Sequence, residues 1–255
     1  MLRNLLVFCV LLSIRAYARL FYRHEQEWVN EEPLDDRWPP YRIVAILNHT
    51  SLFEFLLAGQ VPTRFLWRMA SHCTVPIADI TIQRPVIGLF WRLVAANVVP
   101  ISRERDRTWE EVLASVDDPE AMIIILPEGR MKRRGGLDKH GKPLTVRGGI
   151  ADLIRVSPEG KMLLAYNQGL HHIQAPGEGR PRFFQPVRLR LEQIDIGPYR
   201  ARLLEGLDSD QMSRFRKRVV ADLTARRDRY CTSDHGGTDG PESEWRGAEH
   251  PRAFY

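Results

Sequence analysis

The chain has 255 residues, of which 44% are hydrophobic and 27% charged, so it can bury a full core in one large domain with appendages rather than in two equal domains. Its three cysteines are odd in number and widely spaced, which argues against a disulfide framework or a CxxC metal site. The net charge is +5, and 32 of the 37 basic residues are arginines, whose planar side chains suit phosphates and carboxylates. The arginine excess can equally reflect the base composition of a genome.

The N-terminus combines an apolar run with regularly spaced arginines. Leu5 to Ile14 is an uncharged run of ten residues, which as a helix is about 15 Å long, half the thickness of a bilayer core. Arg15, Arg19 and Arg23 follow on one helical stripe. This pattern predicts a helix that lies in an anionic membrane face. A signal peptide cleaved near Ala16-Tyr17-Ala18 and an ordinary buried helix are the alternatives.

The rest of the chain alternates predicted strands and helices. The predicted strands are apolar segments bounded by turn residues: Ile43 to Leu47, Val98 to Ser102, Met122 to Leu126, Met162 to Ala165 and Val187 to Ile194. The predicted helices lie between or after them: Phe53 to Ala58, Val86 to Val94, Thr108 to Ser115, Ile150 to Val156 and Ser209 to Tyr230. We therefore expect an α/β fold, with a mostly buried mixed sheet flanked by helices. The expected divisions are a membrane-associated helix (1–30), one domain (31–230) and a disordered tail (231–255).

His49 and Glu54 lie five positions apart directly after the first predicted strand, in the stretch AILNHTSLFEFLL. On an uninterrupted helix these side chains would point about 140° apart. A turn after Leu47, with Thr50 or Ser51 capping the next helix, would instead bring the carboxylate to the imidazole. Such a pair fixes the ring tautomer and makes the histidine more basic, as a general base requires.

Further motifs follow in a fixed order. The first block, Asn48-His49-x4-Glu54, is followed by Val99 to Arg103, then by Ile125 to Arg130 and a basic loop at Met131 to Gly136. In this order the sequence resembles the glycerolipid acyltransferase superfamily, with its N-H-x4-D, F-I-x-R and F-P-E-G-T-R blocks. The resemblance covers roughly Ile43 to Ile154.

The resemblance implies a role for each matching residue. His49 would be the general base and Glu54, in place of the family's aspartate, would orient it. Substrate binding would fall to Asn48, Arg103, Glu128, Gly129, Arg130 and Lys132. Backbone N–H groups near the Glu128-Gly129 turn are the expected oxyanion donors.

The sequence departs from the family pattern at two further places. Arg130 and then Met131 stand where the family has threonine and then arginine, so the phosphate-binding cation has moved by one place or passed to Lys132 or Arg133. The fourth block of the family is rich in valine and proline, whereas Lys161 to Gly169 contains no proline. Both departures concern the head group of the acceptor.

The expected function is O-acyl transfer from acyl-CoA or acyl-carrier protein to a lysophospholipid such as lysophosphatidic acid. The thioester is a co-substrate, no cofactor or metal is expected, and the expected partners are membrane lipids and the donor, with no nucleic acid. The expected location is the cytoplasmic face of the cell membrane, and the oligomeric state is left open. One alternative is a degenerate, non-catalytic lipid-binding member of the family. A second is a periplasmic hydrolase that uses Ser51 and His49, although the chain lacks a G-x-S-x-G elbow around them.

Overall fold

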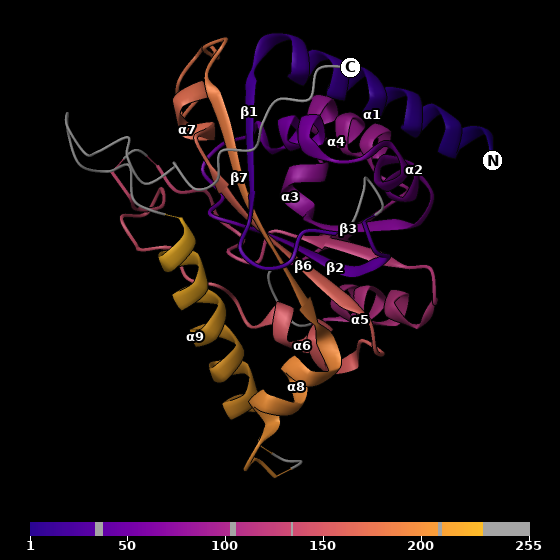
Figure 1. The fold of residues 1–255 in the computed structure, drawn as a ribbon, viewed down its shortest axis with the longest axis vertical. Helices are drawn as coiled ribbons and strands as arrows, with labels where there is room; N and C mark the ends of the chain where they lie inside the picture. Colours follow the sequence, from indigo (N-terminus) through magenta and orange to yellow (C-terminus); the bar gives the residue numbers. More distant parts are fainter. Residues whose placement is uncertain (34–37, 103–105, 134, 209–210, 232–255) are drawn as a thin grey trace.

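A single mixed sheet organises the chain, as seen in a computed structural model that describes residues 1–33, 38–102, 106–133, 135–208 and 211–231 (Figure 1). Within these residues the strand order is β1-β7-β6-β2-β5-β3-β4, and β6 and β7 are the one antiparallel pair. The strands are β1 (Arg23–Trp28), β2 (Tyr41–Leu47), β3 (Cys73–Ala78), β4 (Asn97–Ile101), β5 (Met122–Ile125), β6 (Lys161–Gln168) and β7 (Pro186–Asp195). The predicted α/β class and mixed sheet are confirmed.

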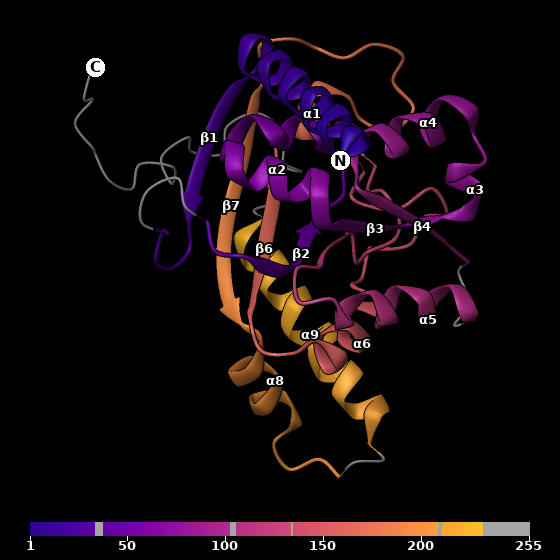
Figure 2. The same ribbon diagram turned by 90° about the vertical axis from the view of Figure 1, so that its right-hand side faces the viewer.

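Helices cover both faces of the sheet (Figure 2). One face carries α1 (Leu2–Phe21), the 3₁₀ segment η1 (Glu54–Gln60), α2 (Thr63–His72), α3 (Asp79–Ile82), α4 (Pro85–Val94) and α7 (Leu170–Ile173). The other carries α5 (Arg107–Ala114), η2 (Ser115–Asp117), α6 (Gly149–Val156), α8 (Ile196–Leu204) and α9 (Met212–Tyr230). The central strand β2 serves both cores: Ile43 and Ala45 pack against the second layer and Val44 against the first. This is why the predicted central strands read as continuous apolar runs.

The edge strand β1 is a correction to the predicted N-terminal unit. We predicted one helical unit over residues 1–30, but α1 ends at Phe21, and Arg23–Trp28 pairs in parallel with β7. The strand is polar, and Glu25 and Glu27 accept hydrogen bonds from Arg188 and Arg190 of β7, each at 2.8 Å. Charged side chains are typical of edge strands, and they hid this one from a search for apolar alternation.

Two other elements, the strand β3 and the segment η1, differ from the predictions. The strand β3 was missed because Pro76 interrupts it, but β3 pairs with β5 only through Cys73 and Thr74, so the proline lies beyond the part that is paired on both sides. The segment predicted as a helix over Phe53 to Ala58 is the 3₁₀ helix η1. Ser51 accepts a hydrogen bond from the Phe53 N–H at 3.2 Å, which makes a local turn instead of the expected helix cap.

The helix α1 has 20 residues, twice the length of the uncharged run from Leu5 to Ile14 that it contains. Its 20 residues make it about 30 Å long, so by length and composition it meets the requirement for crossing a membrane, as some buried helices and signal sequences also do. Val7, Leu11 and Ala18 are buried against the domain. The predicted disordered tail lies, from residue 232 onward, outside the described residues, as do the first two residues of the helix predicted over Ser209 to Tyr230.

Candidate active site

His49 and Glu54 meet at the carboxyl end of β2, as predicted. His49 Nδ1 lies 2.7 Å from Glu54 Oε1, and both side chains are largely shielded, with exposed fractions of 16% and 10%. The carboxylate also accepts a longer hydrogen bond, 3.4 Å, from the Ser51 N–H. Glu54 therefore reaches the imidazole in spite of being one methylene longer than aspartate.

The turn that makes this contact possible is formed at Asn48. Asn48 has φ +67°, a left-handed conformation that asparagine tolerates better than most residues. Its side-chain amide donates to the Asn167 carbonyl of β6 at 2.8 Å, which anchors the turn to the neighbouring strand. Asn48 thus shapes the site through its backbone conformation, and the substrate contact expected from the sequence stays a prediction.

Glu128 holds the histidine backbone in place. The parallel pairing of β2 with β5 brings the residues after β5 alongside the turn. Glu128 is 2% exposed, and its two carboxylate oxygens accept hydrogen bonds from the Asn48 N–H at 3.2 Å and the His49 N–H at 2.8 Å. Its carboxylate therefore positions the backbone of Asn48 and His49, and the substrate contact expected of Glu128 stays a prediction.

Arg227 completes this arrangement and was missed by the sequence analysis. It lies near the end of α9, 99 residues from Glu128, and its Nη1 donates to Glu128 Oε1 at 3.0 Å and to the Leu144 carbonyl at 2.9 Å. In the sequence it is one of many arginines of a basic helix, and no local spacing relates it to Glu128. The surrounding carboxylates, Asp228 and Glu128, raise its pKa although burial opposes this.

The electrostatics of the site favour a basic histidine. Burial lowers the pKa of His49, but the adjacent Glu54 and the nearby Glu128 outweigh it and raise that pKa above its ordinary value of 6.5. Since the Nδ1 position faces Glu54, the ring nitrogen available to a substrate is Nε2.

We expect a Glu54→Gln substitution to lower the pKa of His49, because the amide removes the charge that stabilises the imidazolium. A pKa raised by folding contributes stability that is complete below the ordinary value of 6.5 and is lost as pH rises through the raised pKa. The free energy of unfolding should therefore differ most between parent and variant at about pH 6 and least above the raised pKa. NMR titration of the ring measures the first effect, and denaturant unfolding the second.

The control is Glu110→Gln, at an exposed position on α5. An unchanged His49 titration in Glu54→Gln would contradict the conclusion that Glu54 raises the pKa of His49.

The remaining predicted binding residues follow Glu128. Gly129 adopts φ +61°, which glycine permits, and its N–H donates to the Leu126 carbonyl at 3.1 Å. This N–H, one of the predicted oxyanion donors, is therefore already used within the turn. Arg130 is paired with Asp138 at 2.6 Å, so its guanidinium holds the loop. Arg103 lies outside the described residues.

Asp138 is the centre of a hydrogen-bond network in the loop that follows Gly129 and contacts His49. It is buried, and hydrogen bonds from the Lys142 N–H and the His140 N–H, together with the Arg130 guanidinium, lower its pKa to about 2. The same loop brings the Lys132 N–H to the His49 carbonyl at 2.8 Å. The backbone of Lys132, another of the predicted binding residues, thus lies beside His49.

Two nearby groups of the nucleophilic type, the Ser51 hydroxyl and the Cys231 thiol, are hydrogen-bonded or protonated. The Ser51 hydroxyl donates to the Gln174 carbonyl at 2.8 Å and is fully buried, which counts against the Ser51 hydrolase alternative. Burial raises the pKa of the Cys231 thiol to about 12, and a protonated thiol is a poor nucleophile. The Thr50 hydroxyl is buried and has no hydrogen-bond partner among the described residues.

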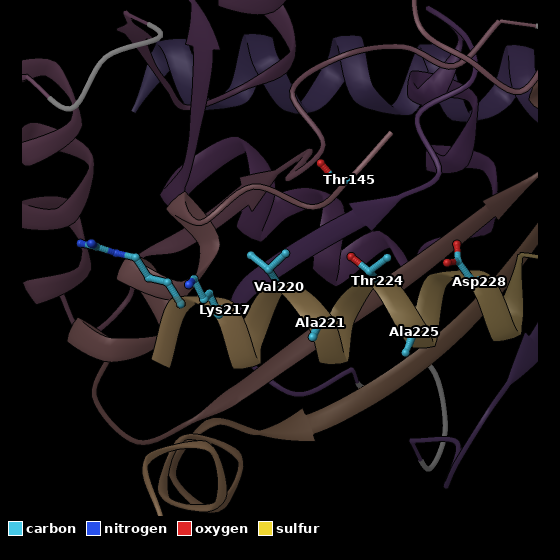
Figure 3. A pocket seen from close by; sticks show the side chains of 8 residues that line it. Thr145, Lys217, Val220, Ala221, Thr224, Ala225 and Asp228 are labelled. Carbon is cyan, nitrogen blue, oxygen red and sulfur yellow. The ribbon is translucent and has the colours of Figure 1, made fainter. Parts of the chain in front are cut away.

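A groove of about 570 Å³ runs along α9 (Figure 3). Val220 and Thr224 point from the helix toward Thr145 on the loop that precedes α6, and Asp228 closes one end. His49 and Glu54 do not line it.

The fold and site together define an α/β protein with a partly buried histidine–carboxylate pair at the carboxyl ends of its central parallel strands. No protein-family model and no curated protein matches the chain. Among solved structures, it is similar to the crystal structure of the 1-acyl-sn-glycerophosphate (LPA) acyltransferase PlsC from Thermotoga maritima. The sequence identity is 20%, the TM-score is 0.49, and the match covers 85% of this chain and 79% of the other. The function of this chain is therefore inferred from its own site.

Proposed function

We propose that this protein is an O-acyltransferase. It would move a fatty acyl group from acyl-CoA or acyl-carrier protein to the hydroxyl of a lysophospholipid of the lysophosphatidic acid type. The observation that carries the proposal is the 2.7 Å contact between His49 Nδ1 and Glu54 Oε1. It orients the ring and leaves Nε2 free to accept a proton, which is the requirement for a general base.

The proposed reaction needs one proton carrier. His49 Nε2 takes the proton of the acceptor hydroxyl as the oxygen forms a bond to the thioester carbonyl carbon. Glu54 stabilises the resulting imidazolium. The tetrahedral intermediate collapses with cleavage of the carbon–sulfur bond, and the departing thiolate receives the proton from His49. Because a thiolate is a good leaving group, no acyl-enzyme intermediate is needed.

Binding of the acceptor phosphate is proposed to fall to Lys132 and Arg103. Support for Lys132 is its backbone contact with His49 at 2.8 Å, which keeps the residue beside the base. Arg103 rests on the resemblance alone. Arg130, paired with Asp138, is proposed to stabilise the loop rather than to bind phosphate.

Membrane lipids are the proposed source of the acceptor, and the cytoplasmic face of the cell membrane is the proposed location. Support comes from α1, whose 20 residues are long and apolar enough to associate with a bilayer.

The test is the release of free thiol from acyl-CoA by the purified chain, with and without lysophosphatidic acid. Acyl transfer predicts thiol release that depends on the acceptor and an equal amount of doubly acylated lipid by mass spectrometry. Lipid binding without thiol release would identify the non-catalytic alternative, and thiol release independent of the acceptor would identify a hydrolase. Either result overturns the proposal.

A further inference from the structure

The C-terminal end of α9 is held by side chains from the last two strands. The carbonyl of Tyr230, the final residue of α9, accepts hydrogen bonds from Gln168 Nε2 of β6 at 2.7 Å and from Arg190 Nη1 of β7 at 3.3 Å. The last carbonyls of a helix have no partner within the helix, so contacts from outside decide how well its final turn is ordered. Gln168 therefore serves as a cap for α9 that the sheet supplies.

Gln168 is a costly residue at its position in the sheet. It is 5% exposed, and every residue of β6 after Lys161 is buried. A buried amide costs free energy unless it is hydrogen-bonded, and an apolar side chain would carry no such cost. Alternation along β6 places Gln168 on the same face as Tyr166, whose ring centroid lies 5.0 Å from that of Tyr230. The amide is thus placed where the end of α9 needs a donor.

The capped turn of α9 is the turn that carries Arg227. The Cys231 N–H donates to the Arg227 carbonyl at 2.7 Å, which closes the helix directly after Tyr230. Arg227 Nη1 donates to Glu128 Oε1 at 3.0 Å, and Glu128 Oε2 accepts from the His49 N–H at 2.8 Å. A continuous series of contacts therefore connects the end of β6 to the backbone of the proposed base.

The preceding residue of β6 contacts the turn at His49 directly. The Asn167 carbonyl accepts from the side-chain amide of Asn48 at 2.8 Å, and the side-chain amide of Asn167 donates to the Asn48 carbonyl at 3.4 Å. Successive side chains of a strand point to opposite faces, which lets Asn167 contact the turn while Gln168 contacts α9. The turn and the helix that support His49 are thus both hydrogen-bonded to the end of one strand.

We propose that Gln168 is a positioning residue for His49 and acts through the end of α9 and Arg227. It belongs to the segment Lys161 to Gly169, whose departure from the family pattern was expected to concern the head group of the acceptor. The contacts of Asn167 and Gln168 assign both residues to the support of the base. The effect on the backbone of His49 is independent of any substrate, whereas the effect on turnover rests on the proposed acyltransferase function.

The first measurement is the kinetics of Gln168→Met, which keeps much of the side-chain volume and removes the donor to the Tyr230 carbonyl. We expect kcat to fall about tenfold, because a catalytic group misplaced by about 1 Å can cost up to about 100-fold. KM should stay within about twofold of the parent, since the base acts in the transition state. The matched control is Gln211→Met, the same substitution at the other end of α9, where the side chain contacts Asp208 and Arg214. It should behave as the parent.

The second measurement needs no turnover and separates positioning from a general loss of stability. In hydrogen exchange followed by NMR, the His49 N–H should exchange about tenfold faster in Gln168→Met, because the support of its acceptor Glu128 is weakened. The N–H of Ile123 is the internal reference, since this residue is paired on both sides within the sheet and should keep its rate. In an Arg227→Met background, Gln168→Met should change neither kcat nor His49 exchange further, because the contact through which it acts is already lost.

Three results would overturn the proposal. They are parent values of kcat and His49 exchange in Gln168→Met, equal acceleration of exchange at His49 and Ile123, and a loss of kcat that adds in full to that of Arg227→Met. If the parent transfers no acyl group but His49 exchange responds as expected, the proposed function is wrong and the positioning holds. If the parent turns over and Gln168→Met matches it, the positioning is wrong and the proposed function holds.

Discussion

A His49→Ala substitution is expected to reduce kcat/KM for acyl transfer by roughly 10³-fold, within the range of about 10² to 10⁴ that general base catalysis contributes. The imidazole is the group positioned to accept the proton of the acceptor, and its removal leaves Glu54 without a ring to orient. Measured rates of thiol release at saturating acceptor should show the loss in kcat, because the imidazole acts in the transition state rather than in binding.

The matched control for this substitution is His140→Ala. His140 is exposed, and its contribution to the loop is a backbone N–H that alanine retains. It should behave as the parent. Equal activity of His49→Ala and His140→Ala would show that another group serves as the base, and the proposed mechanism would be wrong.

The central strands could be predicted from the sequence because burial on both faces leaves a local signature. The run Met122–Ile125 has four apolar residues in succession, all buried, as expected for an inner parallel strand. The same reasoning failed for β1, a mostly polar strand that pairs along β7 and whose Glu25 and Glu27 face Arg188 and Arg190. A search for apolar patterns has no means of finding such a strand.

The site divides in the same way into local and distant parts. The contact between His49 and Glu54 is local: a strand, a turn residue that tolerates positive φ and a short connection are enough to specify it. Glu128 contacts His49 and Arg227, which are distant in the sequence, and Arg130 contacts Asp138 across a loop. The sequence therefore identified Glu128 and Arg130 but not what they contact. The contact of Arg227 with Glu128 could not be predicted, because it forms only when α9 packs beside the Glu128 turn.

A Glu128→Gln substitution is expected to lower the free energy of unfolding by about 1–3 kcal/mol, because it removes one of the two carboxylates that pair with the partly buried guanidinium of Arg227 and leaves Asp228 as the other. The two side chains are shielded, with exposed fractions of 1% and 12%. The amide also retains only one acceptor oxygen for the Asn48 and His49 N–H groups that the carboxylate now serves with two. Since the lost contacts hold the backbone of the proposed base, kcat should fall more than KM rises.

The complementary Arg227→Met variant separates structural from electrostatic effects, since it removes the cation but keeps much of the buried volume. We expect it to destabilise by about 1–3 kcal/mol, because Glu128 keeps its two backbone donors. The Glu128→Gln and Arg227→Met double variant should lose clearly less than the sum of the two, as a double-mutant cycle in denaturant unfolding would show. Arg229→Met, exposed on the same helix, should be nearly neutral. Additive losses would mean that α9 stabilises the fold without supporting the turn at His49. A coupling with a matching loss of kcat in Arg227→Met would make the end of α9 part of the machinery that positions the base.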